Sequence, residues 1–423
     1  MMEDQQRTPY TFHTASPYTP PPPPENRPPA EPKEERPRGF SGRVKLLTVL
    51  LVALCVIAGG TFLLLQSWHS SGPTAGVQNG AQAPAKPWCA PPQGLSTNFV
   101  GFGIAGRSSH DVWSIGAGIM HWDGKKWSVS FRPLSAQLVL RNMVEIAPDN
   151  IWAVGEQLTN GLASHPFTAH YDGKNWSVVT APDGAPGGKN TLVAVSGTAS
   201  DNVWAVGFQV PARGPLASLI EHWDGQRWSV VKHPEPVSGL QFTSVKAFAS
   251  NDVWAVGYGS VLRNGKSVNQ PVIEHWNGQA WSVVASPDLT PSGGGALYAL
   301  DGPNSNDLWA VGSASNRLLS EHWDGQSWKI IDTPAVPPDS SNWLASVAVS
   351  SSGGVWVVGR IRDGSNAFQP FIGHWDGHQW QVLQDTADNA GELDQITQID
   401  GQYWIVGIPR SNGGHAFIHV LCP

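Results

Sequence analysis

The sequence predicts an all-β fold: a seven-bladed β-propeller with four-stranded antiparallel blades, preceded by a disordered Pro-rich tail and one transmembrane helix. Three observations predict the propeller. A unit of roughly 48 residues recurs from about residue 88 to the end of the chain, which is a period typical of propellers. Most of the 21 tryptophans fall inside that unit. The 423 residues also include 46 Gly and 35 Pro, so long helices cannot dominate the fold.

The repeated unit accounts for most of the tryptophan. It reads Asp-Val-Trp-Ala-Val-Gly, then a variable loop, then His-Trp-Asp-Gly-x-x-Trp-Ser-Val-Val. Its first Trp column comprises Trp113, Trp152, Trp204, Trp254, Trp309, Trp356 and Trp404. Two further aromatic columns follow in the first six units, and the three columns together hold 18 of the 21 tryptophans. Tryptophan is therefore a structural residue of this fold before it is a functional one.

Each unit offers four short strands, here labelled A to D. Strand A is an alternating segment such as 192–195, and strand B carries Val-Trp-Ala-Val-Gly. Strand C ends in Glu-His-Trp, and strand D is Trp-Ser-Val-Val. We expect the Asp-Gly pair between C and D, as at Asp224 and Gly225, to supply the positive φ values of a tight hairpin turn. A four-stranded meander has two apolar faces, so the units must stack around an axis, with indole rings filling the widening wedge.

The two ends of the repeat region are expected to share the last blade. Residues 393–421 supply strands A, B and C of a seventh unit, and the chain ends before a strand D. Trp88 precedes Cys89 much as the third-column tryptophans precede Ser, so residues 86–90 are predicted to supply the missing strand. Cys89 and Cys422 would then lie in neighbouring strands, where they can form a disulfide outside the cytoplasm.

The first 85 residues divide into three predicted segments. Residues 1–43 contain 11 prolines and read as a disordered cytoplasmic tail, with a proline-rich ligand for an aromatic groove as the alternative. Residues 44–66 hold the uncharged run 46–65, which is long enough to be a transmembrane helix; a cleaved signal peptide is the competing interpretation. Residues 67–85 read as a flexible stalk before the propeller at 86–423.

The charges around the apolar run predict the orientation of the chain in a cell membrane. Basic residues precede the run, at Arg36, Arg38, Arg43 and Lys45, and the next one after it is Lys86. The positive-inside rule then places the N-terminus in the cytoplasm and the propeller outside, as a single-pass membrane protein. Cys55 lies inside the apolar run and is expected to be buried in the membrane.

Composition excludes several functional classes. The formal net charge is −7, and no strongly basic face is available to follow phosphates, so no nucleic-acid partner is expected. Three cysteines are too few for a metal or disulfide framework. No cofactor is predicted, because no cofactor motif is present.

One face of the ring is predicted to bind a ligand. In a meander the A-to-B and C-to-D loops share one face, and these loops are short and nearly constant. The B-to-C and D-to-A loops share the opposite face and vary in length and composition, as recognition loops do. The B-to-C loops carry basic residues at Arg213, Arg263, Lys266, Arg317, Arg360, Arg362 and Arg410. A ring of guanidinium groups for anionic ligands is one hypothesis, and ordinary solvated charge is the other.

A recurring histidine invites a metal hypothesis, which the geometry disfavours. The column comprises His121, His170, His222, His275, His322, His374 and His419. Strand C is the third strand from the axis, so these rings lie too far apart to share an ion. We expect each histidine to hydrogen-bond to the neighbouring strand beside the Trp, and no metal site is predicted. The turn aspartates are likewise explained by the hairpin.

Catalysis needs an asymmetric set of residues, and the sequence shows no motif that provides one. The polar residues that depart from the repeat are His165, His233, Glu235, Asp363, His378, Glu392, Asp394 and His415. Nothing in their order sets a nucleophile, a base and an orienting group. We therefore assign no catalytic residue.

The Trp-Ala-Val-Gly repeats resemble the kelch and galactose-oxidase central-domain class of propellers, over about residues 88–423. The double-Gly core of kelch repeats and the Ser-x-Asp-x-Gly boxes of sialidases are absent. The resemblance implies a binding platform or scaffold more often than one defined reaction. The sequence therefore favours a non-catalytic, membrane-tethered recognition module for a protein or a cell-surface glycan or polymer. Two alternatives stay open: a propeller hydrolase, lyase or oxidase acting on the same face, and a transmembrane signalling receptor.

Overall fold

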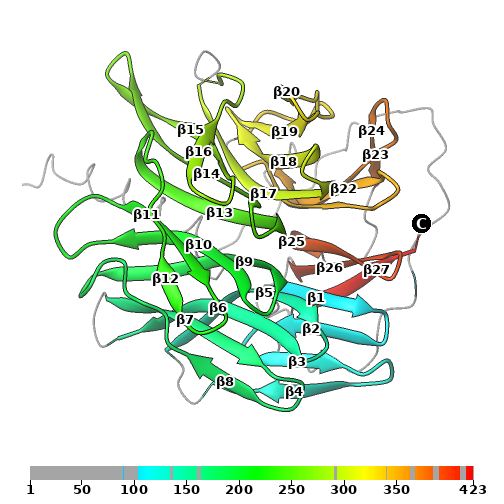
Figure 1. Ribbon diagram of the computed structural model, residues 1–423. Helices are drawn as coiled ribbons and strands as arrows, with labels where there is room; N and C mark the ends of the chain where they lie inside the picture. The colour runs from blue at the N-terminus through cyan, green and yellow to red at the C-terminus, as the bar shows by residue number, and fades with distance from the viewer. Residues whose placement is uncertain are drawn as a thin grey trace, which may run out of the picture. The chain divides into compact units, whose positions relative to one another are not determined.

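The computed structural model (Figure 1) describes an all-β protein. It describes Cys89 and residues 103–133, 137–159, 163–289, 293–339, 341–362, 367–383, 390–409 and 416–422. The chain divides into two units, Met1–Ser70 and Ser71–Pro423, and all described residues belong to the second. The predicted tail, membrane helix and stalk lie outside the described residues. Within those residues, no helix has the length and apolar character that crossing a membrane requires.

Short antiparallel meanders follow one another along the described chain. The first strands of the meanders are β1 (Gly103–Ser108), β5 (Leu138–Ala147), β9 (Lys189–Ala199), β13 (Ser238–Ala249), β17 (Gly295–Asn304), β21 (Trp343–Val349) and β25 (Ala390–Ile399). The second strands are β2 (Asp111–Ile115), β6 (Asn150–Leu158), β10 (Asn202–Val210), β14 (Asp252–Arg263), β18 (Asp307–Ala314), β22 (Val355–Arg362) and β26 (Gln402–Pro409).

The outer half of each meander is shorter. The third strands are β3 (Ile119–Trp122), β7 (Ser164–Tyr171), β11 (Ala217–Trp223), β15 (Lys266–Trp276), β19 (Arg317–Trp323), β23 (Phe368–Trp375) and β27 (Phe417–Leu421). The fourth strands are β4 (Trp127–Phe131), β8 (Trp176–Val179), β12 (Trp228–Val230), β16 (Trp281–Val284), β20 (Trp328–Ile330) and β24 (Trp380–Leu383). The predicted strands A to D correspond to these four positions.

Hydrogen bonding groups the described strands into six sheets, of which four are four-stranded, one is eight-stranded and one is three-stranded. The eight-stranded sheet contains two meanders, β5 to β8 and β9 to β12. A single parallel pair, Ser164 with Lys189, joins them. The sequence predicts seven blades; because the sheets number six, that count stays a prediction.

The first strands form a closed ring around a central axis (Figure 1). Each contacts the first strand of the next meander, and β25 contacts β1. At every junction between neighbouring first strands, a polar side chain of one strand forms a hydrogen bond with a backbone group of the next. The bonds run from Arg107 to Ile146 O, Asn142 to Val195 N, Ser196 to Ala247 N, Ser244 to Leu300 N, Asp301 to Val349 N, Ser346 to Ile396 O, and Gln395 to Ile104 N. This arrangement is a β-propeller.

Tryptophans of the second strands fill the wedges between neighbouring meanders, as the sequence predicts. Trp152 on β6 packs against Trp223 and Trp228 of the following meander, with ring centroids 4.9 and 5.3 Å away. The last meander repeats the pattern across the chain ends, since Trp404 shares a buried cluster with residues of β3 and β4. Burying indoles at every junction removes a large apolar area from water, which stabilises each contact between neighbours.

The loops between third and fourth strands depart from the predicted turn in one respect. Trp223 pairs with Trp228, so the loop contains four residues, and Gly225 has a positive φ of 90°. Asp224 does not take a positive φ. Its carboxylate instead accepts hydrogen bonds from the backbone N–H groups of residues 226 and 227, at 2.9 and 2.8 Å. Aspartate is selected at this position as a hydrogen-bond acceptor, which corrects the expectation that both residues supply positive φ.

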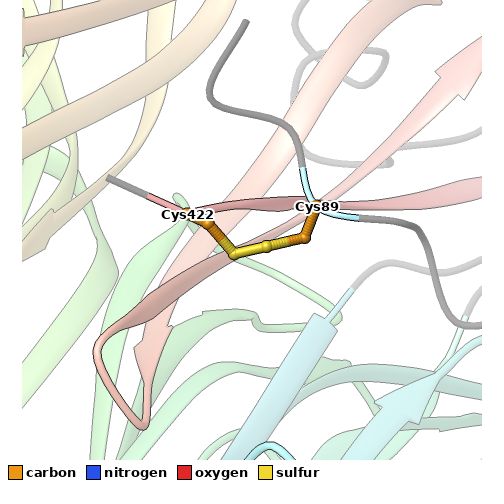
Figure 2. Close-up of a disulfide and its surroundings, with 2 residues drawn as sticks. All are labelled: Cys89 and Cys422. Carbon is orange, nitrogen blue, oxygen red and sulfur yellow. A yellow bond between two sulfur atoms is a disulfide. The ribbon is translucent and has the colours of Figure 1, made fainter.

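The two ends of the repeat region meet at β27, as predicted. The backbone N–H of Cys89 donates a hydrogen bond to the carbonyl of Val420 at 2.9 Å. Figure 2 shows the disulfide between Cys89 and Cys422, whose Cα atoms lie 5.7 Å apart across a separation of 333 residues. Trp88 and the rest of the predicted closing strand lie outside the described residues. Both cysteines pack against the same buried cluster as Trp404.

Candidate functional site

The constant and variable loops lie on opposite faces of the ring. A Cβ atom added at Gly225, in a loop between third and fourth strands, would lie 3.0 Å from Cβ of Asp201, in a loop between first and second strands. Gly173 stands in the same relation to Asp149, and Gly278 to Asn251. These loops therefore share one face. The remaining loops, which vary in length, emerge at the opposite face, called the variable face below.

A polar cavity of about 470 Å³ runs between the first strands. Its lining includes four charged side chains: Glu145, Lys246, Asp301 and Asp394. Lys246 Nζ lies 2.6 Å from Asp301 Oδ1, so this cation is neutralised within the cavity. Burial raises the pKa of Glu145 to about 7, and nearby Asp111 adds to the effect. The cavity is thus acidic overall.

At the variable-face end of this cavity, a group of residues departs from the repeat. We call the group the axial site: Tyr298, Trp343, Arg360, Phe368, Glu392 and Asp394. Among the described residues, Trp343 is the tryptophan that belongs to none of the repeat columns. Trp343 and Phe368 begin β21 and β23, and Arg360 lies near the end of β22. Tyr298, Glu392 and Asp394 lie in the first halves of β17 and β25, which are the halves toward the variable face.

Arg360 is held rigidly at the centre of the axial site. Its guanidinium carbon lies 3.5 Å from the ring centroid of Trp343 and 4.1 Å from that of Phe368. Nη1 donates to Glu392 Oε2 at 2.6 Å. Two aromatic contacts and an ion pair with a carboxylate fix the position of the guanidinium group. Arg360 is therefore a structural clamp for the two aromatic rings.

Asp394 lies beside this clamp and lines the cavity. Burial raises the pKa of its carboxyl group, and the nearby charge of Glu392 raises it further, while Arg360 acts in the opposite direction. Its Oδ2 atom is buried and has no hydrogen-bond partner among the described residues. Asp394 lies at a β-bulge in β25. The residues at the corresponding bulges of several other first strands, such as Thr243 and Ala345, are uncharged.

The predicted basic residues divide into two groups. Arg213, Arg263, Lys266 and Arg317 are exposed in three separate variable-face loops, and Arg263 pairs in register with Lys266 at a hairpin tip. Arg360 and Arg362 share β22 and are half-buried; Arg362 lies 4.5 Å from the centroid of Phe368. Arg362 Nε also lies 3.9 Å from Asp339 Oδ1. Arg410 lies outside the described residues. The structure thus brings Arg360 and Arg362 together beside Phe368 and places Arg263 with Lys266 at one hairpin tip, whereas Arg213 and Arg317 lie in separate loops.

The histidine column has the structural role that its position predicts. His222 stacks on Trp204 with centroids 4.3 Å apart, and its Nε2 lies 3.1 Å from Asn202 Oδ1 on the neighbouring strand. The same contact recurs at His121, His170, His275 and His322, with Asp111, Asn150, Asp252 and Asp307 respectively. The Asp or Asn two residues before the Trp is therefore the partner, a role that the sequence analysis did not assign. Among the described residues, no group of His, Cys, Asp and Glu could hold a metal ion.

Three buried glutamates form a feature that the sequence analysis missed. Glu221, Glu274 and Glu321 occupy the same position in three consecutive third strands, and each is fully buried. Burial raises the pKa of Glu221 to about 8 and that of Glu321 to about 7. The available signal was Glu-His-Trp in three adjacent units where the others carry Met, Ala, Gly or Ile before the histidine.

Glu274 belongs to a buried chain of polar groups between two meanders. His233 Nδ1 lies 3.3 Å from Glu274 Oε2, and His233 Nε2 lies 3.1 Å from Ser218 Oγ. Burial raises the pKa of Glu274, and its bond with His233 partly offsets this. The order serine, histidine, carboxylate is that of an acyl-transfer triad. However, Ser218 is only 2% exposed and also donates to Glu235 at 3.2 Å, so a substrate has no access to its hydroxyl.

The other polar residues that depart from the repeat have separate surroundings. His165 pairs with Asp183 at 2.9 Å on the surface, and His378 is exposed in a turn. Asp363 and His415 lie outside the described residues. The structure therefore gathers only Glu392 and Asp394 of this set at the axial site, and His233 with Glu235 at the buried chain.

Comparisons with known proteins identify no family. No family model matches the chain, and no curated protein matches it. Among solved structures, the chain is similar to YCF48 bound to D1 peptide, at 16% identity and a TM-score of 0.43, over 67% of this chain and 82% of that one. It is also similar to YCF48 from Cyanidioschyzon merolae, at 14% identity and a TM-score of 0.48, over 78% of this chain and 97% of that one.

Proposed function

We propose that the protein is a non-catalytic recognition or scaffold module whose variable face binds a protein or a cell-surface polymer. The axial site is the observation that carries this proposal. The repeat explains nearly every tryptophan by packing, yet Trp343 is outside the repeat and is only half-buried. It lies beside Tyr298, which lines the cavity. Rigid aromatic side chains beside a fixed charge are typical of binding hot spots.

The scaffold around the axial site suits recognition. Seven blades, closed by a strand from residues 86–90, would hold the variable loops at fixed spacing around the site. The exposed residues Arg213, Arg263, Lys266 and Arg317 are suited to contact a ligand at the periphery. Arg360, which is paired with Glu392, would act by holding Trp343 and Phe368 in place. A kelch-like relationship would accord with such a platform.

The same proposal places the module outside the cell membrane. The uncharged run 46–65 would anchor the chain, residues 67–85 would separate the anchor from the ring, and the basic residues before the run would keep the N-terminus in the cytoplasm. The disulfide between Cys89 and Cys422 supports an oxidising compartment for the folded part.

A binding screen with matched variants tests the proposed function. The full-length chain is screened against arrays of glycans, cell-wall polymers and extracellular proteins. Trp343→Ala is expected to weaken the binding of any ligand found by at least tenfold, because a hot-spot aromatic is lost. Lys126→Ala, which alters an exposed residue on the opposite face, is the control and is expected to bind normally. Equal binding by wild type and Trp343→Ala would exclude the axial site as the binding surface.

A hydrolytic activity is the second candidate, favoured only by the chain Ser218, His233 and Glu274. A fluorophosphonate probe, which labels activated serines, distinguishes the two functions. The recognition proposal predicts no labelling of Ser218, because that residue is buried. Labelling that disappears in Ser218→Ala would favour the enzyme instead.

A further inference from the structure

Some charged groups at the axial site and in the cavity have ion-pair partners, and one carboxyl group does not. The cation that lines the cavity and the cation of the axial site both have partners: Lys246 lies 2.6 Å from Asp301, and Arg360 lies 2.6 Å from Glu392. The Arg360 guanidinium also contacts two aromatic rings, those of Trp343 and Phe368. In contrast, Oδ2 of Asp394 is buried without a hydrogen-bond partner among the described residues. Asp394 also lines the cavity and forms no ion pair among the described residues, so a ligand that enters the cavity meets a carboxyl group without a paired cation.

We propose that the variable-face end of the cavity binds a lysine or arginine side chain of a protein partner, with Asp394 as its counter-ion. This inference rests on the proposed function, because it names the chemical class that the axial site recognises. The neighbouring aromatic groups suit such a ligand. Tyr298 lines the cavity and lies 6.4 Å from Trp343, measured between ring centroids, so an alkyl stem has apolar surface to follow while its cation reaches Asp394.

A metal ion is a poorer fit to this position. Hard cations need several oxygen ligands, and Asp394 is a single carboxylate. The polar side chains deeper in the ring are engaged in bridging neighbouring strands: Asn142, Ser244 and Gln395 each accept a backbone N–H of the next first strand. No metal-binding group was found among the described residues. An organic cation, which needs one strong acceptor and a sleeve of apolar and aromatic surface, fits better.

Binding of a cation should release a proton. The pKa of Asp394 is raised by burial and by Glu392, with Arg360 the opposing charge that faces it. A bound ammonium group favours the ionised carboxylate, so binding must first displace the proton. The affinity for a cation is therefore expected to rise with pH, by up to about tenfold for each pH unit below the raised pKa.

Titration calorimetry with the full-length chain tests the inference. The probe is a pentalysine peptide with an acetylated N-terminus and an amidated C-terminus, whose side chains stay charged to about pH 9, and the ligand control is the same peptide with acetylated side chains. Wild-type protein is expected to bind pentalysine at least tenfold more tightly at pH 9 than at pH 6, and not to bind the acetylated peptide. Asp394→Asn should remove this binding at both pH values. The substitution removes a buried charge, so it should not unfold the protein.

Asp224→Asn is the matched control for charge. It makes the same change on the opposite face, in a turn where the neighbouring unit already carries Asn277, and it should bind like wild type. Equal binding by Asp394→Asn and wild type, or no binding of pentalysine by wild type, would overturn the inference. If a screened ligand needs Trp343 but not Asp394, this inference fails while the proposed function stands. If no ligand needs either residue, both fail.

Discussion

Histidine shows, at the scale of single residues, how a recurring residue is explained by packing. His222 and His374 both stack on the Trp of the second strand, at centroid distances of 4.3 and 4.4 Å. Only His222 has an Asn or Asp in reach, because Gly354 occupies the corresponding position before Trp356. Burial lowers the pKa of both rings, so both are neutral near pH 7. The two residues thus differ mainly in one hydrogen bond.

This difference predicts unequal costs for two identical substitutions. His222→Ala should lower the free energy of unfolding by about 1 kcal/mol more than His374→Ala, because only the first removes a hydrogen bond as well as a stacked ring. Chemical denaturation of the two variants measures the difference. Equal losses in the free energy of unfolding would show that the hydrogen bond contributes nothing and that each histidine stabilises the fold only by stacking on the Trp.

Glu221 makes stability depend on pH. Its carboxyl group is fully buried, without a partner among the described residues, and its pKa is raised from 4.5 to about 8. The folded state therefore holds a proton that the unfolded state has lost across this window. A raised carboxyl pKa means that stability falls as pH rises, by up to about 1.4 kcal/mol per pH unit for this one group.

Removing this titration should flatten the profile. Glu221→Gln is expected to gain stability relative to wild type as pH rises from 5 to 8, and to differ little at pH 4, where both side chains are neutral. Thermal unfolding followed across this range is the measurement, with Asp332→Asn as a control at an exposed site. A stability difference that stays constant with pH would contradict the account.

At the scale of elements, the sequence predicts the second and fourth strands better than the first strands. The periodic Trp-Ala-Val-Gly and Trp-Ser-Val-Val segments fall on second and fourth strands, as predicted. First strands are longer than expected: β9 covers Lys189–Ala199, whereas alternation indicated only 192–195. Polar residues such as Ser196 point toward the next first strand and accept its backbone N–H, so they interrupt the apolar pattern that marks a strand.

Two turn glycines differ in how closely the adjacent loop packs against them. Gly225 and Gly377 both have positive φ, at 90° and 96°, but only Gly225 is crowded by the adjacent loop. Gly377→Ala should cost about 1 kcal/mol through backbone strain alone. Gly225→Ala should cost more, because its Cβ would lie 3.0 Å from that of Asp201. Equilibrium denaturation compares the two variants; the reverse order would argue against close packing of these loops.

At the scale of the whole molecule, the ring could be predicted and the axial site could not. The period of the repeat predicts that the units stack around an axis. The last unit lacks a fourth strand, and Cys89 and Cys422 lie near the two ends of the repeat region, so these features indicated where those ends meet. The axial site depends on residues 343, 360, 368 and 392, which come from separate strands and match no motif. Only their departure from the repeat distinguishes them, and it does not show that they are neighbours. Closure around an axis brings them together.

Ring closure is the claim on which the cavity, the two faces and the axial site all depend. The most direct test is peptide mass spectrometry of the full-length chain, digested without reduction after expression in an oxidising compartment. The account predicts one linked pair of peptides containing Cys89 and Cys422, with Cys55 as a free thiol. Recovery of Cys89 and Cys422 in separate peptides, or of either one linked to Cys55, would contradict it.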